Sequence, residues 1–235
     1  MTAELFRDDG YLAECDGRIV DSVEHGLVLD QTVFFSRGGG QPGDIGTLEL
    51  ESGKIMLVTD CYRDPQSGLH IHQIDDPPSD IPMGCQVVAR LDWQRRHKIM
   101  RLHSALHMLC AAVPAPVTGG SIREESARLD FDLPEPPDKQ SIEDSVNELI
   151  HADHPMEILW ISDEEMMANQ HLVRTLAVAP PMGSGQVRLV KFGDADLQPC
   201  GGTHVRSSSE IGPIRIQSIK KKGRQNRRIT LEFSS

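Results

Sequence analysis

Two histidines four residues apart, His103 and His107, are the first residues of this sequence whose spacing suggests chemistry. They lie in a segment whose apolar residues recur at helical spacing. A helix places side chains at positions i and i+4 on one face, about 6 Å apart, so that both imidazoles could bind one metal ion. An isolated pair of this kind is also typical of a partly exposed helical surface without any ligand.

A second pair, Cys200 and His204, strengthens the metal interpretation. The two glycines between them let the backbone turn sharply enough for a thiolate and an imidazole to converge. Nitrogen and sulfur donors together suit zinc. We therefore predict one Zn²⁺ ion bound by His103, His107, Cys200 and His204.

The ligand count leaves open whether this zinc is structural or catalytic. Four protein ligands are typical of a closed structural site, whereas a catalytic zinc usually keeps three ligands and a water molecule. Two common zinc hydrolase types are excluded. Ser104 follows His103 where an H-E-x-x-H peptidase has glutamate, and the chain has no P-C-x-x-C segment of the kind found in nucleoside deaminases.

The first 91 residues are predicted to form a small, mostly β, barrel-like domain. Between residues 13 and 90, short apolar runs are broken by Asp-Gly, His-Gly and glycine-rich turns. The segments 48–50 and 55–58 flank Glu-Ser-Gly-Lys and predict a hairpin. A last strand is expected at 85–91.

Residues 92–235 are predicted to form a larger α+β domain with an antiparallel sheet, which makes the whole chain α+β. Helices are expected at 92–110, with Asp92 as N-cap, at 141–150, and from the capping box of Ser162 and Glu165 to about Leu172. The expected strands are 186–192, 212–219 and 228–233, the last two pairing around a basic turn.

Composition restricts the class of protein. Hydrophobic residues make up 38% and charged residues 25% of the 235 residues, which is typical of a globular protein. We expect a cytoplasmic protein, because the start lacks signal-peptide features and no apolar run reaches the roughly 20 residues of a membrane span. The five cysteines are scattered, which argues against a disulfide framework.

Charge is distributed unevenly. The formal net charge of -11 argues against a nucleic-acid partner, yet residues 211–231 hold seven lysines and arginines and no acidic residue. This basic run is either a solvated hairpin tip that aids solubility or an edge that binds phosphates.

Four segments of the chain carry a family resemblance: FFSRGGGQPGDIG at 34–46, RLHSALHML at 101–109, SARLDF at 126–131 and CGGTHV at 200–205. They resemble the editing domains of alanyl-tRNA synthetases and their free-standing relatives, the AlaX-type trans-editing proteins. Their order and spread, together with the glycine-rich segment, resemble those of the medium-length AlaX class.

The resemblance implies a zinc-dependent hydrolase that deacylates seryl-tRNA(Ala), with glycyl-tRNA(Ala) as a further substrate, at a zinc bound by the four ligands above. The chain is too short to include an aminoacylation domain, so the expected reaction uses no ATP. No membrane partner is expected. For sensing the serine hydroxyl, Thr118 in a glycine loop is the first choice and Thr203 the second. Backbone capping is the alternative role for either threonine.

The resemblance also implies contacts with tRNA. Its acceptor end would meet the glycine-rich segment and its phosphates the basic edge, although three consecutive glycines also fit a simple turn with positive φ. The residues expected to contact tRNA are Arg37, Gly38, Gly39, Gly40, Gln41, Asp44, Lys220, Lys221, Lys222 and Arg224.

Two other functions remain open at this point. One is a non-enzymatic RNA-binding module with a structural zinc. The other is an editing hydrolase for another aminoacyl-tRNA, such as seryl-tRNA(Thr). The sequence does not predict an oligomeric state.

Overall fold

The computed structural model describes residues 2–75, 81–174 and 185–234. The chain forms two compact units, Met1–His97 and Lys98–Ser235. The division lies inside the helix α1 (Trp93–Ala112). The sequence had predicted it after residue 91, before this helix. No helix in these three ranges is long and apolar enough to cross a membrane.

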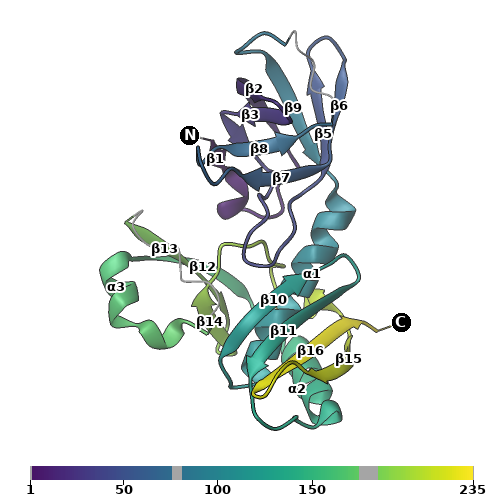
Figure 1. Ribbon diagram of the computed structural model, residues 1–235, viewed down its shortest axis with the longest axis vertical. Helices are drawn as coiled ribbons and strands as arrows, with labels where there is room; N and C mark the ends of the chain where they lie inside the picture. Colours follow the sequence, from purple (N-terminus) through teal and green to yellow (C-terminus); the bar gives the residue numbers. More distant parts are fainter. Residues whose placement is uncertain (1, 76–80, 175–184, 235) are drawn as a thin grey trace. The chain divides into compact units, whose positions relative to one another are not determined.

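The N-terminal unit is built on a seven-stranded sheet with the order β6-β5-β9-β2-β3-β8-β7 (Figure 1). A short parallel pair, β1 with β4, lies outside it. The hairpin of β5 and β6 is confirmed. The strands are β1 (Ala3–Glu4), β2 (Glu14–Val23), β3 (Gly26–Leu29), β4 (Gln31–Thr32), β5 (Gly46–Leu50), β6 (Ile55–Val58), β7 (Asp60–Arg63), β8 (His70–Gln73) and β9 (Gln86–Leu91).

Strand β2 joins the two halves of this sheet. Its first part, through Arg18, pairs with β9, and its second part, from Ile19, pairs with β3. The register shifts between Ile19 and Asp21, where a bulge lets the strand bend. The barrel-like arrangement that we expected is not formed by the described residues, since the sheet stays open between its edge strands β6 and β7.

The C-terminal unit contains two antiparallel sheets, ordered β10-β11-β16-β15 and β12-β13-β14. The α+β class and the pairing of the last two strands around the basic turn are confirmed. The strands are β10 (Val117–Ile122), β11 (Ser126–Asp132), β12 (Met156–Ser162), β13 (Gln186–Phe192), β14 (Asp196–Pro199), β15 (Ile214–Lys221) and β16 (Asn226–Phe233).

The helices begin at residues whose side chains cap them. In α2 (Lys139–His151) the cap is Asp138, whose carboxylate accepts the Ser141 backbone N–H, so this helix begins before the predicted residue 141. The capping box of α3 (Asp163–Ala168) is present as predicted, but the helix ends earlier than expected and a 3₁₀ turn follows. Three 3₁₀ turns among the described residues are Leu5–Arg7, Gln170–Leu172 and Ser208–Ile211.

The four-stranded sheet has one apolar and one polar face. Its buried face carries alternate residues of three strands, and α2 lies beside β15, where Asn147 bonds the backbone N–H and carbonyl of Ile214. The opposite face is lined by polar and charged side chains. The residues on the buried face include Ala127, Leu129, Phe131, Ile214, Ile216, Ile229 and Leu231.

Candidate metal centre and its surroundings

Helix α1 carries two of the four predicted ligands. Asp92 caps its start, because its carboxylate accepts the Arg95 backbone N–H at 3.0 Å. His103 and His107 follow on one face and are only 9% and 3% exposed. Their ring centroids are 5.6 Å apart, in keeping with the i, i+4 spacing.

The other two ligands lie in the loop after β14. Arg188 on β13 is buried and holds this loop, since its Nη1 donates to the carbonyl oxygens of Cys200 at 2.6 Å and Gly202 at 3.1 Å. The backbone N–H of Cys200 donates back to the Arg188 carbonyl at 3.1 Å. Arg188 was not predicted from the sequence, because the pairing of β13 with β14 is what brings it beside the loop.

The two ligand pairs converge. One ligand atom from each of His103, His107, Cys200 and His204 lies within 4.8 Å of all the others. The Cys200 Sγ is 3.5 Å from Nε2 of His103 and 3.2 Å from Nε2 of His204. Three imidazoles and one thiol therefore form a group that could hold one metal ion.

Two neighbouring side chains orient the imidazoles. Nδ1 of His107 is 2.7 Å from Oδ2 of Asp196, which also accepts from Nε2 of Gln198 at 2.8 Å. Nδ1 of His204 is 3.2 Å from the Ser104 hydroxyl oxygen. With Nδ1 engaged, each ring presents Nε2 to the cluster, the arrangement usual for metal-binding histidines. The only sequence signal for Asp196 was a carboxylate shortly before Cys200.

The cluster favours a positive charge at its centre. Burial opposes ionisation of the Cys200 thiol, but the adjacent imidazoles of His103 and His204 outweigh it and hold its pKa well below the usual value. Burial also opposes protonation of His107, yet hydrogen bonds to Asp196 and Cys200 raise its pKa to about 9. Oδ1 of Asp196 is buried without a hydrogen-bond partner among the described residues. A buried thiolate and carboxylate fit a bound cation.

A second cluster of cysteine and histidine, not predicted from the sequence, lies in the N-terminal unit. Ligand atoms of the buried Cys61, His70 and His72 are within 4.8 Å of one another. His72, however, uses both ring nitrogens: Nε2 is 2.7 Å from the Thr32 hydroxyl and Nδ1 is 3.2 Å from the Leu27 carbonyl oxygen. Burial lowers its pKa to about 3, which keeps the ring neutral. These contacts account for His72 as a core residue.

The two threonines occupy different surroundings. Thr118 lies on strand β10 and not in the glycine loop that we expected. Its hydroxyl is 3.1 Å from both the Asp130 carbonyl oxygen and Oδ1 of Asn226. Thr203 lies between two ligands, in the loop held by Arg188, and is 1% exposed.

The glycine-rich segment contains a tight turn. Gly38 and Gln41 exchange two backbone hydrogen bonds, of 3.1 and 2.9 Å. Gly39 and Gly40 between them have φ angles of 57° and 85°, a region that favours glycine. The three glycines of this turn are exposed, whereas Gln41 is buried.

Asp44 anchors the same segment in the core of the N-terminal unit. Its carboxylate is 2% exposed, accepts from Nε of the buried Arg96 at 2.9 Å and from the Phe35 backbone N–H at 2.6 Å. It is therefore not an exposed polar group of the kind expected to contact tRNA. Arg37 is exposed and forms an ion pair with Asp60 at 2.6 Å.

The basic residues predicted to contact phosphates lie at the hairpin of β15 and β16. Lys220 and Lys221 end β15, and Lys222 and Arg224 lie in the turn. All four are exposed.

Known proteins resemble both parts of the chain. Residues 7–95 match the family described as tRNA synthetases class II (A). Residues 187–230, which include the Cys200 loop, match the family described as threonyl and alanyl tRNA synthetase second additional domain.

Relatives of similar length share a single description. The alanyl-tRNA editing protein AlaX-M of Saccharolobus solfataricus is 33% identical, over 97% of this chain and 98% of its own length. The protein of the same description from Methanosarcina mazei is 31% identical, over 97% of this chain and 95% of its own. The alanine–tRNA ligase of Pyrobaculum arsenaticum is 32% identical over 94% of this chain, which spans 25% of that ligase. The chain belongs to the AlaX-M family of alanyl-tRNA editing proteins.

Proposed function

We propose that this protein is a trans-editing hydrolase that deacylates seryl-tRNA(Ala), with glycyl-tRNA(Ala) as its further substrate. We propose also that a zinc ion is its cofactor. The observation that carries the proposal is the convergence of four donor atoms within 4.8 Å in a chain of this family. The descriptions of the full-length relatives as alanyl-tRNA editing proteins support it.

The residues of the cluster fit zinc. His103, His107 and His204 offer nitrogen and Cys200 offers sulfur, the donor types that zinc prefers. Oδ1 of Asp196 beside them is buried and has no hydrogen-bond partner in the part of the chain that the structure describes, so a nearby cation would accommodate it best. When bound, zinc supplies a Lewis acid for an ester carbonyl or lowers the pKa of a water molecule.

The proposed reaction is hydrolysis of an ester. The oxygen of a water molecule adds to the carbonyl carbon, and the bond from that carbon to the terminal ribose oxygen breaks. The amino acid leaves as a carboxylic acid and the ribose oxygen takes up a proton, so that no ATP is required. The chain contributes a fixed loop, held by Arg188, and an imidazole oriented by Asp196. The exposed turn at Gly38, Gly39 and Gly40, together with Arg37, is proposed to approach the acceptor end of the tRNA.

Selection of serine over alanine requires a group that bonds the serine hydroxyl. A site built to hydrogen-bond a hydroxyl disfavours the analogue that lacks it by several kcal/mol. Thr203 suits this role because it is buried in the loop between the ligands Cys200 and His204, whereas Thr118 lies on strand β10. Thr203→Val should lower the ratio of seryl to alanyl hydrolysis by at least about tenfold, and Thr118→Val should lower it less. Equal effects of the two variants would remove the preference for Thr203.

The proposal is tested by incubating the pure protein with seryl-, glycyl- and alanyl-tRNA(Ala) and with seryl-tRNA(Thr). We expect rapid release of serine from tRNA(Ala), release of glycine, and little release of alanine. Equal hydrolysis of all four substrates, or of none, would end the proposal. Preferential hydrolysis of seryl-tRNA(Thr) would assign the protein to a different aminoacyl-tRNA.

The four-ligand count favours one other function, an RNA-binding module with a purely structural zinc. Cys200→Ala separates the two. A structural zinc predicts loss of cooperative unfolding in this variant, whereas the proposed enzyme predicts a folded protein without deacylation. Circular dichroism melts and the serine-release assay on the same sample give both answers.

A further inference from the structure

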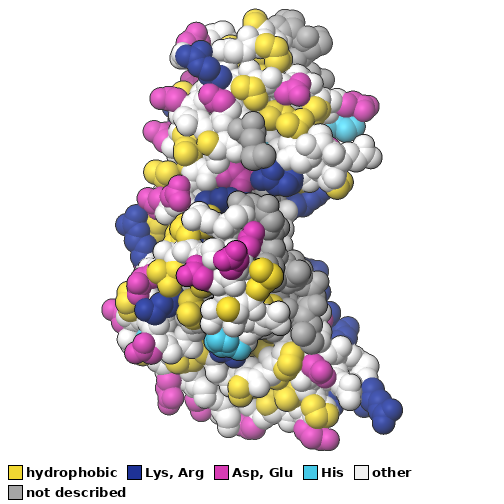
Figure 2. Space-filling model, turned by 90° about the vertical axis from the view of Figure 1, so that its left-hand side faces the viewer, with side chains coloured by type: hydrophobic (Ala, Val, Ile, Leu, Met, Phe, Trp, Pro, Cys, Tyr) yellow, Lys and Arg dark blue, Asp and Glu magenta, His cyan; other side chains and the backbone are white. Residues whose placement is uncertain are grey.

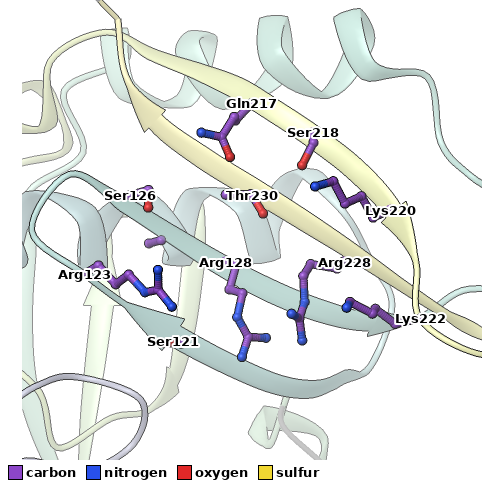
Figure 3. A pocket seen from close by; sticks show the side chains of 11 residues that line it. Ser121, Arg123, Ser126, Arg128, Gln217, Ser218, Lys220, Lys222, Arg228 and Thr230 are labelled. Atoms are coloured by element: carbon purple, nitrogen blue, oxygen red, sulfur yellow. The ribbon is translucent and has the colours of Figure 1, made fainter.

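The polar face of the four-stranded sheet is hollowed by a cavity of about 260 Å³ (Figure 3). Its floor follows from the strand register. Ser121, Arg128, Thr230 and Ser218 form one row across the four strands, since each is paired with the next. Three of these four side chains are small, so the row leaves space between the longer side chains around it.

Five cationic side chains line this cavity, with serine, threonine and glutamine between them and no acidic residue in the lining. They come from both hairpins of the sheet and reach toward the same space in Figure 3. We call them the sheet cations; they are Arg123, Arg128, Lys220, Lys222 and Arg228.

Two of the sheet cations are held in position by one carboxylate. Arg228 forms two 2.7 Å hydrogen bonds to the two carboxylate oxygens of Asp130, which also accepts from Nη1 of Arg128 at 3.0 Å. The Arg228 guanidinium lowers the pKa of Asp130, which therefore stays ionised. Arg228 and Arg128 carry two positive charges against the single negative charge of Asp130, so these three side chains together keep a net positive charge.

The other three sheet cations have no acidic partner. Among the described residues, Arg123, Lys220 and Lys222 form no ion pair or side-chain hydrogen bond. This gathering of positive charge contrasts with a chain of net charge -11, whose acidic side chains are spread over the face shown in Figure 2. Like charges held together on an acidic molecule indicate a polyanionic ligand.

We propose that this cavity binds backbone phosphates of the tRNA, with Arg123, Lys220 and Lys222 as the direct contacts. The inference rests on the proposed function for the choice of RNA, and it adds a binding surface to it. Lysine and arginine bind phosphate oxygens as ions, and the hydroxyls of Ser121 and Thr230 add neutral donors. Lys221 and Arg224, which share the basic turn, do not line the cavity.

The test compares Arg123→Gln, Lys220→Gln and Lys222→Gln with Lys139→Gln, which removes one exposed charge from α2 in the same unit. Binding of uncharged tRNA(Ala) is measured by fluorescence anisotropy over a series of KCl concentrations. We expect each cavity variant to bind several-fold more weakly and to reduce the slope of log K against log salt by about 1, with no such change for Lys139→Gln.

A second measurement separates this inference from the proposed function. With seryl-tRNA(Ala) the cavity variants should raise KM and keep kcat, and with the small ester 3′-O-seryl-adenosine they should match the wild type. If the wild type binds tRNA as expected but hydrolyses neither ester, the proposed function fails and the binding surface stands. If the cavity variants bind tRNA like Lys139→Gln, the inference is overturned, and an acidic protein becomes the better occupant.

Discussion

Asp196 lies on strand β14 beside the metal centre, and its two carboxylate oxygens have different surroundings. Its Oδ2 accepts the Nδ1 proton of His107 and a hydrogen from Gln198, while Oδ1 has no partner among the described residues. A carboxylate in this position fixes the ring and raises the basicity of its other nitrogen. We therefore propose that Asp196 is a positioning residue that acts through His107.

Replacing this carboxylate should weaken zinc binding without unfolding the protein. We expect Asp196→Asn to lower zinc affinity by about 10- to 100-fold, the usual effect of removing such a partner. Competition with a chromogenic chelator measures the change. Asp194→Asn is the matched control, because Asp194 is exposed in the same connection. Equal zinc affinity in the two variants would show that the His107 contact has no such role.

Among single residues, the sequence predicted those candidate ligands that can be identified from their spacing alone. The i, i+4 pair and the Cys-Gly-Gly-Thr-His loop needed only local geometry, and the structure brings them together. Ser104, Arg188 and Asp196 were missed because each acts on a residue brought near by tertiary packing.

The contact between α1 and the glycine-rich segment shows how an element is held in place within the N-terminal unit. Arg96 is fully buried and pairs with Asp44, and it also donates to the carbonyl oxygens of Gly10 and Val33 at 2.9 and 2.7 Å. One guanidinium thus ties together three separate segments of the unit.

Removing the Arg96 guanidinium should lower the stability of the fold. Arg96→Ala would leave the Asp44 carboxylate buried without its partner, and we expect a loss of about 3–5 kcal/mol in the free energy of unfolding. Urea denaturation of the full chain measures it. Arg90→Ala is the comparison, because Arg90 also pairs with two carboxylates but on an exposed surface, and its loss should matter far less. Similar midpoints for both variants would contradict a structural role for the buried pair.

Helices and strands were predicted well where the spacing of apolar residues and the helix-capping residues gave a clear signal. Helix α1 with its Asp92 cap and strand β13 at 186–192 are confirmed. Strand β10 was taken for a loop because Gly119 and Gly120 mimic turn residues, and only their pairing with β11 makes them a strand. The open N-terminal sheet could not be distinguished from a barrel, since strand patterns do not encode whether edge strands meet.

The molecule as a whole should hold one zinc ion and not two. Of the two clusters found among the described residues, the one at Cys200 directs histidine Nε2 atoms to the thiol, whereas both nitrogens of His72 beside Cys61 are engaged. Elemental analysis should find one zinc per chain. It should fall to none in Cys200→Ala and stay at one in Cys61→Ala. A content of two, reduced to one by Cys61→Ala, would assign a second metal to the N-terminal unit.

The donor pairs of the metal centre lie far apart along the chain, at residues 103–107 and 200–204. During synthesis the chain emerges from its N-terminus, and early parts fold before later parts exist. The helix that carries His103 and His107 is therefore synthesised well before Cys200 and His204. A nascent chain can therefore assemble all four ligands of the proposed metal site only after His204 has left the ribosome.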